Sequence, residues 1–141
     1  MLIEAPFNAI TERILDAAID VHRTLGPGLL ESTYRECLEF ELSARQMRFD
    51  VERVVPIVYK GTRLRTRYRV DLMVDEQVIV EVKSHATTLP IHEAQVITYL
   101  RLTGYPAGLL INFNVPRLMD GVKRLLNPNA RKFPSRVSEE E

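Results

Sequence analysis

Apolar residues in the first part of the chain recur at the spacing of amphipathic helices. One apolar stripe ends at Gly26-Pro27-Gly28, a sequence that breaks a helix. A second stripe follows this break at the same spacing. The two stripes consist of Ile10, Ile14, Ala17, Val21 and Leu25, and of Leu30, Tyr34, Cys37, Leu38 and Leu42. Two helices are therefore predicted at the start of the chain.

The pattern changes at about Val51 to alternating and β-branched residues, which are typical of strands. Strands are predicted near residues 51–59, 63–74, 78–84 and 107–113, and helices over about 90–103 and 116–126. The order is then ααβββαβα. The helix between the third and fourth strands makes these strands parallel neighbours. We predict an α/β (α+β) fold, in which a mixed central sheet is flanked by helices.

The length of 141 residues predicts one domain, at residues 1–126. Residues 127–141 are polar and aperiodic, and are predicted to form a disordered tail. Cys37 is the single cysteine, which excludes an intrachain disulfide and favours a reducing compartment. The N-terminus lacks the basic region of a signal peptide, and no apolar run is long enough to span a bilayer. We therefore expect a cytoplasmic protein without membrane contact.

Charge is balanced over the whole chain, with 19 basic and 19 acidic residues, but it is not evenly distributed. Residues 53–69 include no acid. The basic residues of this segment are Arg53, Lys60, Arg63, Arg65, Arg67 and Arg69. A local basic patch attracts phosphates even in a neutral protein, so this segment is a candidate for nucleic-acid binding.

Two carboxylates are predicted to face each other across a hairpin centred on Glu76. Antiparallel pairing about this centre places Asp71 opposite Glu81, and Lys83 shares their face. A salt-bridge network and a divalent-cation site are both open interpretations. Facing acids repel each other and one lysine does not compensate both, which favours the cation, and oxygen ligands favour Mg²⁺ or Mn²⁺. The residues predicted to point to the opposite, buried face are Val70, Leu72, Val80 and Val82.

Two further pairs of residues share helix faces. Glu31 and Tyr34 lie three residues apart at the start of the second helix, and Gln95 and Tyr99 lie four apart in the helix that begins at Pro90. Glu31 can instead complement the helix dipole, and Tyr34 can pack in the core. Neither pair alone defines a site.

Gly28, Glu31 and Tyr34 match the motif of the GxxExxY family, and from about residue 10 to residue 126 the chain resembles this branch of the PD-(D/E)XK nuclease superfamily. Further matching positions are His22, Asp71, Glu81-Val82-Lys83, Gln95, Tyr99 and residues 108–113. The resemblance implies a restriction-endonuclease-like core, in agreement with the predicted order of elements.

The resemblance also implies a metal-dependent catalytic site. Asp71, Glu81 and the backbone carbonyl of Val82 would bind Mg²⁺ or Mn²⁺, and Glu31 would join them directly or through a water. Lys83 would orient the attacking water and stabilise charge in the transition state.

Three other residues border this implied site. Gln95 and Tyr99 resemble the QxxxY feature of RecB-type nucleases, which contacts substrate or positions the lysine. His22 is either a further metal ligand or a histidine that complements the C-terminal end of its helix. The complete set of predicted catalytic residues is Glu31, Asp71, Glu81, Lys83, Gln95 and Tyr99.

A row of arginines shares the parity of Asp71 along the second strand. The row consists of Arg63, Arg65, Arg67 and Arg69. In an unbulged strand these side chains would form a basic track on the face of the site and bind nucleic acid together with Tyr99. The alternative is an edge strand whose charges block aggregation.

The leading hypothesis is a metal-dependent nuclease that acts on nucleic acid, with DNA as substrate, and a homodimer is compatible with it. The second is a nucleic-acid-binding or adaptor protein that keeps the nuclease fold without turnover, and the third is a structural interaction domain. The sequences typical of serine hydrolases, P-loops and dinucleotide sites do not occur.

Overall fold

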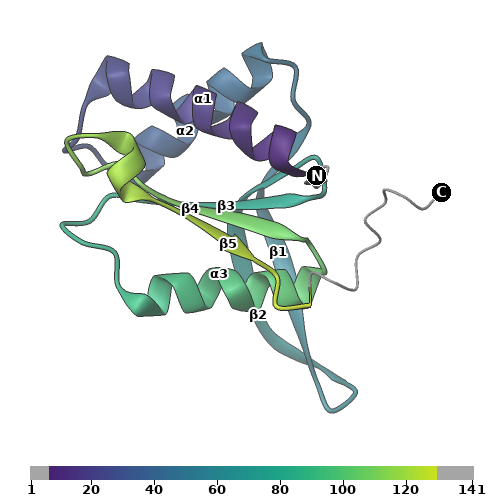
Figure 1. The fold of residues 1–141 in the computed structure, drawn as a ribbon. Helices are drawn as coiled ribbons and strands as arrows, with labels where there is room; N and C mark the ends of the chain where they lie inside the picture. Colours follow the sequence, from purple (N-terminus) through teal and green to yellow (C-terminus); the bar gives the residue numbers. More distant parts are fainter. Residues whose placement is uncertain (1–6, 130–141) are drawn as a thin grey trace, which may run out of the picture.

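The computed structural model describes residues 7–129 and confirms the predicted mixed sheet flanked by helices (Figure 1). Its elements are α1 (Phe7–Leu25), α2 (Glu31–Ala44), β1 (Phe49–Tyr59), β2 (Thr62–Val74), β3 (Val78–Lys83), α3 (Pro90–Thr103), β4 (Ala107–Asn112), the 3₁₀ helix η1 (Leu118–Gly121) and β5 (Val122–Leu126). From α1 to β4 the order is the predicted one.

The sheet has the strand order β1-β2-β3-β4-β5. β3 and β4 run parallel, and the other neighbouring strands are antiparallel. α3 makes the crossover that this parallel pair requires. β1 and β2 are the longest strands, and their hairpin extends beyond the body of the domain (Figure 1).

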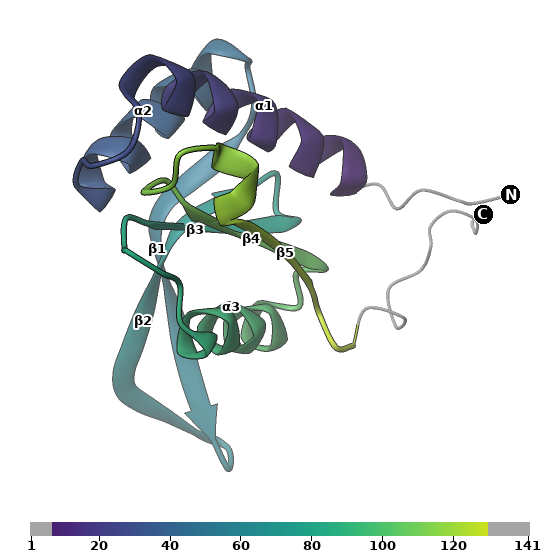
Figure 2. The ribbon, with the colours of Figure 1, turned by 60° about the vertical axis from the view of Figure 1, so that its left-hand side comes forward.

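The sheet separates two apolar cores. α1 and α2 cover one face and α3 covers the other (Figure 2). Val80 and Leu38 belong to the core beneath α1 and α2, whereas Ile79 and Val96 belong to the core beneath α3. Adjacent residues of β3 thus face opposite layers, as the alternation of a strand requires.

The prediction of a helix over residues 116–126 is wrong. The segment forms η1 and then β5, which pairs antiparallel with β4 from Ala107↔Leu126 to Ile111↔Val122. β4 is buried along its length, so its free backbone groups need a partner strand. A Cβ at Gly121 would lie 2.1 Å from the carbonyl oxygen of Asn112, and only glycine allows this approach.

β2 does not alternate regularly through the predicted site. Leu72 packs beneath α1 and α2 as predicted, but Val70 packs beneath α3. The β1–β2 ladder pairs Val51 with Leu72 and Arg53 with Val70, and it skips the pair between them. Glu52, opposite Asp71, has a φ of 52°. The alternation therefore slips at Asp71, and the prediction that Val70 shares the face of Leu72 is wrong.

The end of the described chain is tied to the domain. Asn127, the first residue of the predicted tail, is buried, and its side-chain amide donates to the carbonyls of Leu100 and Tyr105. Residues 130–141 of the predicted tail lie outside the described residues. No helix within residues 7–129 is long and apolar enough to cross a membrane.

Candidate active site

The β2–β3 ladder opens at the predicted carboxylate pair. Backbone pairing runs from Val74↔Val78 to Leu72↔Val80, which is the predicted register. Beyond it, the amide of Asp71 donates to Oε2 of Glu81 over 3.0 Å. The amide of Val82 donates to Oδ2 of Asp71 over 2.8 Å. Each carboxylate thus accepts a backbone hydrogen bond from the opposite strand.

Burial makes both carboxylates of the pair harder to ionise. Burial raises the pKa of Asp71. Glu81 is only 6% exposed. This burial, followed by the charge of Asp71, raises the pKa of Glu81 to about 7. The backbone hydrogen bond that each carboxylate accepts opposes its rise, and so does the charge of Lys83, two residues beyond Glu81 on β3; the charge of Arg35 also opposes the rise of Asp71. At neutral pH the metal-free pair therefore carries less than two full negative charges.

Gly28 and Tyr34 shape the loop that leads to Glu31. Gly28 has a φ of +103°, which favours glycine. Tyr34 is fully buried and stacks on Phe113 with 4.5 Å between ring centroids, so its predicted core packing is correct. Its hydroxyl also donates to the carbonyl of Gly26 and accepts from the amide of Leu29. Tyr34 thus fixes the loop before α2.

Glu31 lies at the start of α2, close to the segment that follows β3. Its Oε2 is 3.0 Å from Nε2 of His85 and accepts a long hydrogen bond of 3.4 Å from the amide of Ser84. The Ser84 hydroxyl donates to the carbonyl of Leu29 over 2.6 Å and joins the two segments. The negative charge of Glu31 adds to the effect of burial and further raises the pKa of the half-buried Asp71.

Sequence reasoning left His85 and His92 without a role and missed Arg35. The rings of His85 and His92 stack with 5.1 Å between centroids at the side of Glu31. Arg35 lines one hollow together with Glu31 and Asp71. Arg35 follows Glu31 by four residues, which is a helix-face spacing, so a signal for it was present. The histidines are distant from Glu31 in the chain and gave no such signal.

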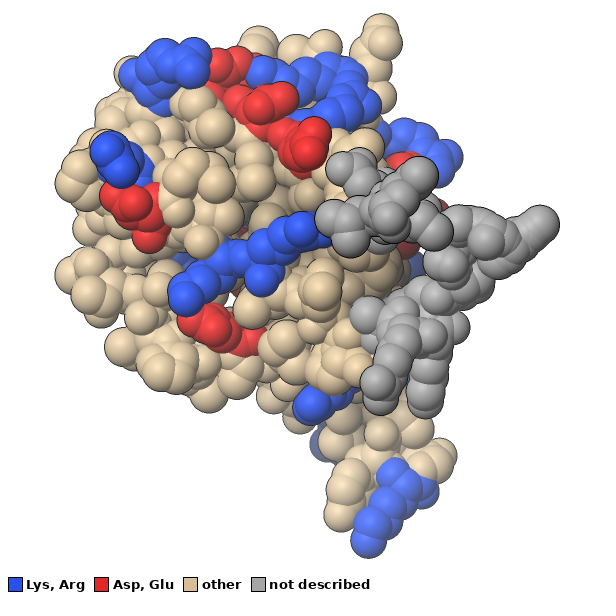
Figure 3. All heavy atoms as spheres, in the orientation of Figure 1, with Lys and Arg blue, Asp and Glu red and all other residues tan. Residues whose placement is uncertain are grey.

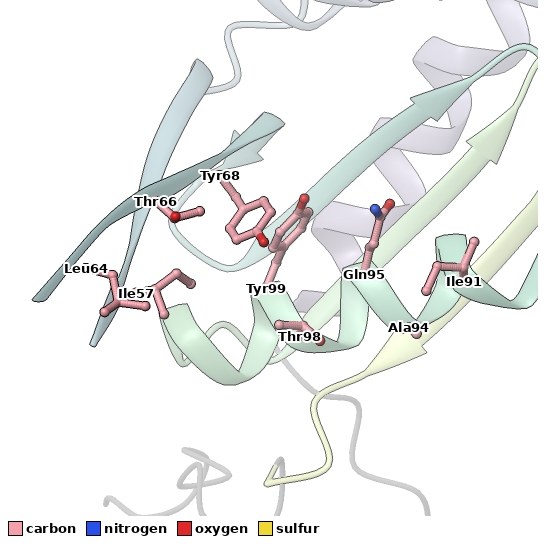
Figure 4. Close-up of a pocket in the computed structure, with 9 residues that line it drawn as sticks. All are labelled: Ile57, Leu64, Thr66, Tyr68, Ile91, Ala94, Gln95, Thr98 and Tyr99. Atoms are coloured by element: carbon pink, nitrogen blue, oxygen red, sulfur yellow. The ribbon is translucent and has the colours of Figure 1, made fainter. Parts of the chain in front are cut away.

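Gln95 and Tyr99 project from the same side of α3, as predicted (Figure 4). Tyr99 is 7% exposed, and burial followed by the charge of Glu81 raises its pKa. Its ring lies 6.2 Å from that of Tyr68 on β2, which sequence reasoning also missed. Both tyrosines and Gln95 line a groove between α3 and the β1–β2 hairpin.

His22 is buried near the end of α1. Its Nε2 lies 2.7 Å from the carbonyl oxygen of Val115, and its ring is 6.5 Å from Phe113. These contacts connect α1 to the segment after β4. The metal-ligand interpretation of His22 stays a prediction.

The predicted arginine row is exposed along the β1–β2 hairpin. The condition of an unbulged strand is not met, because the register shifts between Pro56 and Val58, opposite this row. Leu64 and Tyr68 line the groove with α3, so the alternating arginines project to the other side of the hairpin. Basic side chains gather at the far end of the hairpin (Figure 3). The row consists of Arg63, Arg65, Arg67 and Arg69, and within residues 7–129 none of them forms a salt bridge.

The chemistry of the pair fits a hard divalent cation. Asp71 and Glu81 offer only oxygen donors, and burial followed by the charge of Asp71 makes the ionised form of Glu81 unfavourable without a cation. No three His, Cys, Asp or Glu side chains in the described part of the chain converge on one ion position. An ion at this pair would therefore need backbone oxygen or water to complete its ligands.

Comparisons with known proteins agree with the fold. A family model described as the PD-(D/E)XK nuclease superfamily matches residues 8–125. Among solved structures, the chain is similar to SSO0001, known from a crystal structure, with 17% identity and a TM-score of 0.54. The match covers 95% of this chain and 66% of that one, and at this identity it supports the fold alone. None of the curated proteins matches the chain.

Proposed function

Because the chain belongs to the PD-(D/E)XK nuclease superfamily, we propose that it is a metal-dependent nuclease that hydrolyses phosphodiester bonds of nucleic acid, with DNA as substrate. The observation that carries this proposal is the pair formed by half-buried Asp71 and buried Glu81, with Lys83 on the same strand as Glu81. Membership of the GxxExxY branch, a cytoplasmic location and a homodimer stay predictions.

Asp71, Glu81 and the backbone carbonyl of Val82 would hold the Mg²⁺ or Mn²⁺ ion. A bound ion would supply a Lewis acid for the oxygens of the scissile phosphate. The Glu31 carboxylate contacts the amide of Ser84 and the ring of His85. Within residues 7–129 it does not form a three-residue metal-binding group with Asp71 and Glu81. We therefore favour the second of its two predicted modes, in which Glu31 acts through a water.

Lys83 would act on the attacking water and on the developing negative charge of the phosphate. Its ammonium is close enough to Asp71 and Glu81 to lower the pKa of both carboxyls against the effect of burial. Its backbone carbonyl accepts from the amide of Phe113 over 2.9 Å, so the end of β3 is held in the sheet. A positioned cation of this kind stabilises a transition state more than a ground state.

One observation favours the second candidate, a binding protein that keeps the fold without turnover. The Asp71 carboxylate accepts a hydrogen bond from the amide of Val82, and the Glu81 carboxylate accepts one from the amide of Asp71. Both carboxylates therefore have a structural role without any metal. This use does not explain Lys83, whose ammonium has no ion pair within residues 7–129 closer than 4.0 Å. The nuclease hypothesis explains all three residues.

The test is cleavage of linear, circular, branched and single-stranded DNA in Mg²⁺ or Mn²⁺, with Lys83→Ala as the decisive variant. This variant should keep metal and DNA binding but lose at least about a hundredfold in cleavage rate. Lys83→Arg should not restore the rate fully, because a planar, always charged group does not replace a compact ammonium.

Lys123→Ala is the matched control, since Lys123 lies on β5 at the opposite edge of the sheet from β1. It should cleave like the wild type. A Lys83→Ala protein that cleaves at the wild-type rate would contradict the assigned role of Lys83. A wild type that cleaves none of these substrates with either metal would favour the binding protein.

A further inference from the structure

A groove of about 490 Å³ runs between α3 and the β1–β2 hairpin (Figure 4). Its walls are largely apolar, with Ile57 and Leu64 on the hairpin and Ile91 near the start of α3. Its polar groups are hydroxyls and an amide, such as those of Thr66 and Gln95. The volume lies within the range of sites for small organic groups.

The chemistry of the groove suits a neutral, flat group and not a phosphate. Of the described residues, no charged one lines it, and a phosphate in such surroundings would lose its hydration without a compensating cation. The arginines of β2 alternate with Leu64 and Tyr68 and therefore project away from the groove. A nucleic-acid backbone at Lys83 would still be able to extend a base into the groove.

Two tyrosines form an aromatic platform in the groove. Tyr99 is 7% exposed and serves as its floor, whereas Tyr68 is 46% exposed and offers a free ring surface. Their ring centroids are 6.2 Å apart and the planes are inclined by 47°, so the floor supports Tyr68 without covering it. A supported, half-exposed aromatic ring is the usual partner for an unstacked base.

The groove lies near the carboxylate pair, because Tyr68 precedes Asp71 on β2 by three residues and Tyr99 packs in the same core as Val70, the neighbour of Asp71. The charges of Glu81 and Asp71 contribute to the raised pKa of Tyr99, after burial, so the tyrosine lies within electrostatic reach of both. Gln95 and Tyr99 point from α3 toward the sheet that carries the pair (Figure 4). A nucleotide whose phosphate lies at the carboxylates therefore has its own or a neighbouring base within reach of the groove.

We propose that this groove binds an unpaired nucleobase next to the scissile phosphate, and that the substrate of the site is single-stranded DNA or a single-stranded segment of it. The inference rests on the proposed function. A base in a duplex cannot enter, because both of its faces are covered by its neighbours in the stack. Tyr68 is the platform for the base.

The test compares binding of two fluorescent strands in EDTA, where cleavage does not interfere. One is a short oligothymidylate, and the other is an abasic strand with the same sugar–phosphate backbone. The wild type should bind the strand with bases about tenfold more tightly, the scale of one stacked base. Tyr68→Ala should remove this preference, and Tyr68→Phe should keep it. Tyr59→Ala, at the exposed end of the hairpin and outside the groove, is the matched control and should keep it too.

Equal affinity of the wild type for both strands, or an unchanged preference in a folded Tyr68→Ala protein, would overturn the inference. The inference would also be overturned if sedimentation showed a wild-type dimer that dissociates in Tyr68→Ala, because a second copy of the chain would then occupy the groove. Cleavage in Mn²⁺ is measured separately. Base preference without cleavage refutes the proposed nuclease and leaves the groove assignment intact, whereas cleavage without base preference refutes only the groove assignment.

Discussion

Glu81 should make the metal-free protein less stable as the pH rises. Burial, with a further contribution from the charge of Asp71, raises its pKa from 4.5 to about 7. In the unfolded chain Glu81 loses its proton near pH 4.5, whereas in the folded protein it keeps the proton to about pH 7. The folded state therefore binds more protons between these values, and its stability falls as the pH rises through that window.

The size of the effect follows from the pKa difference. A shift from 4.5 to about 7 corresponds to about 3 kcal/mol, at roughly 1.4 kcal/mol per pKa unit. This contribution is fully present below pH 4.5 and is lost above pH 7. Solvent screens this contribution only weakly, because Glu81 is only 6% exposed. An effect of this size is a large fraction of the stability of an ordinary domain.

The assay is urea unfolding in EDTA at pH 5 and pH 8, for the wild type and Glu81→Gln. The glutamine resembles the protonated acid and can still accept the amide of Asp71. The free energy of unfolding of Glu81→Gln, measured relative to that of the wild type, should rise by about 2 to 3 kcal/mol from pH 5 to pH 8. Glu76→Gln, in the exposed turn of the same hairpin, should show no such gain.

Parallel pH profiles of the wild type and Glu81→Gln would refute this reasoning, because Glu81 would then titrate as an ordinary exposed acid. Mn²⁺ gives a second readout. An ion that binds only the folded site should stabilise the wild type at pH 8 and should have little effect on Glu81→Gln. Equal stabilisation of both proteins by Mn²⁺ would mean that Glu81 is not a ligand.

Three further predictions concern other parts of the site. Asp71→Ala should lose most of its Mn²⁺ affinity in calorimetry, and unchanged binding would exclude the carboxylate pair as the metal site. Replacing Arg65 and Arg67 together with Ala should weaken binding of unrelated DNA sequences alike and lower the salt dependence by about one unit per lost phosphate contact; an unchanged salt slope would favour edge protection. Tyr34→Phe should destabilise the protein by about 1–3 kcal/mol, because the buried hydroxyl of Tyr34 makes two hydrogen bonds to the loop before α2 that phenylalanine cannot replace. Urea unfolding measures this, with the exposed Tyr59→Phe as the control.

The parts of the fold that the sequence predicts well are those with local causes. The helical stripes and the Gly26-Pro27-Gly28 break determine α1 and α2 without help from distant residues. The hairpin register around Glu76 follows from a short turn and is correct from Val74↔Val78 to Leu72↔Val80. β5 has a distant cause, because it forms where β4 needs a partner for its backbone. Its own residues were compatible with a helix.

The side of the site formed by Glu31 and His85 also depends on contacts between distant segments. The hydroxyl of Ser84 donates to the carbonyl of Leu29, and this bond joins residues that are 55 positions apart. Spacing within one helix was enough to pair Glu31 with Tyr34. It contained no information on which loop would lie opposite.

The slip at Asp71 was the feature least accessible to sequence reasoning, and it explains the chemistry of the site. Parity rules assume an uninterrupted ladder, whereas here β2 and β3 separate after Leu72↔Val80. The separation frees the amides of Asp71 and Val82, and the two carboxylates accept them. The same hydrogen bonds that repair the ladder hold both carboxylates in place before any ion binds. A cation would then meet a prearranged pair and would lose little binding free energy in ordering its ligands. The irregularity that defeats prediction by alternation is therefore the structural basis of the proposed metal site.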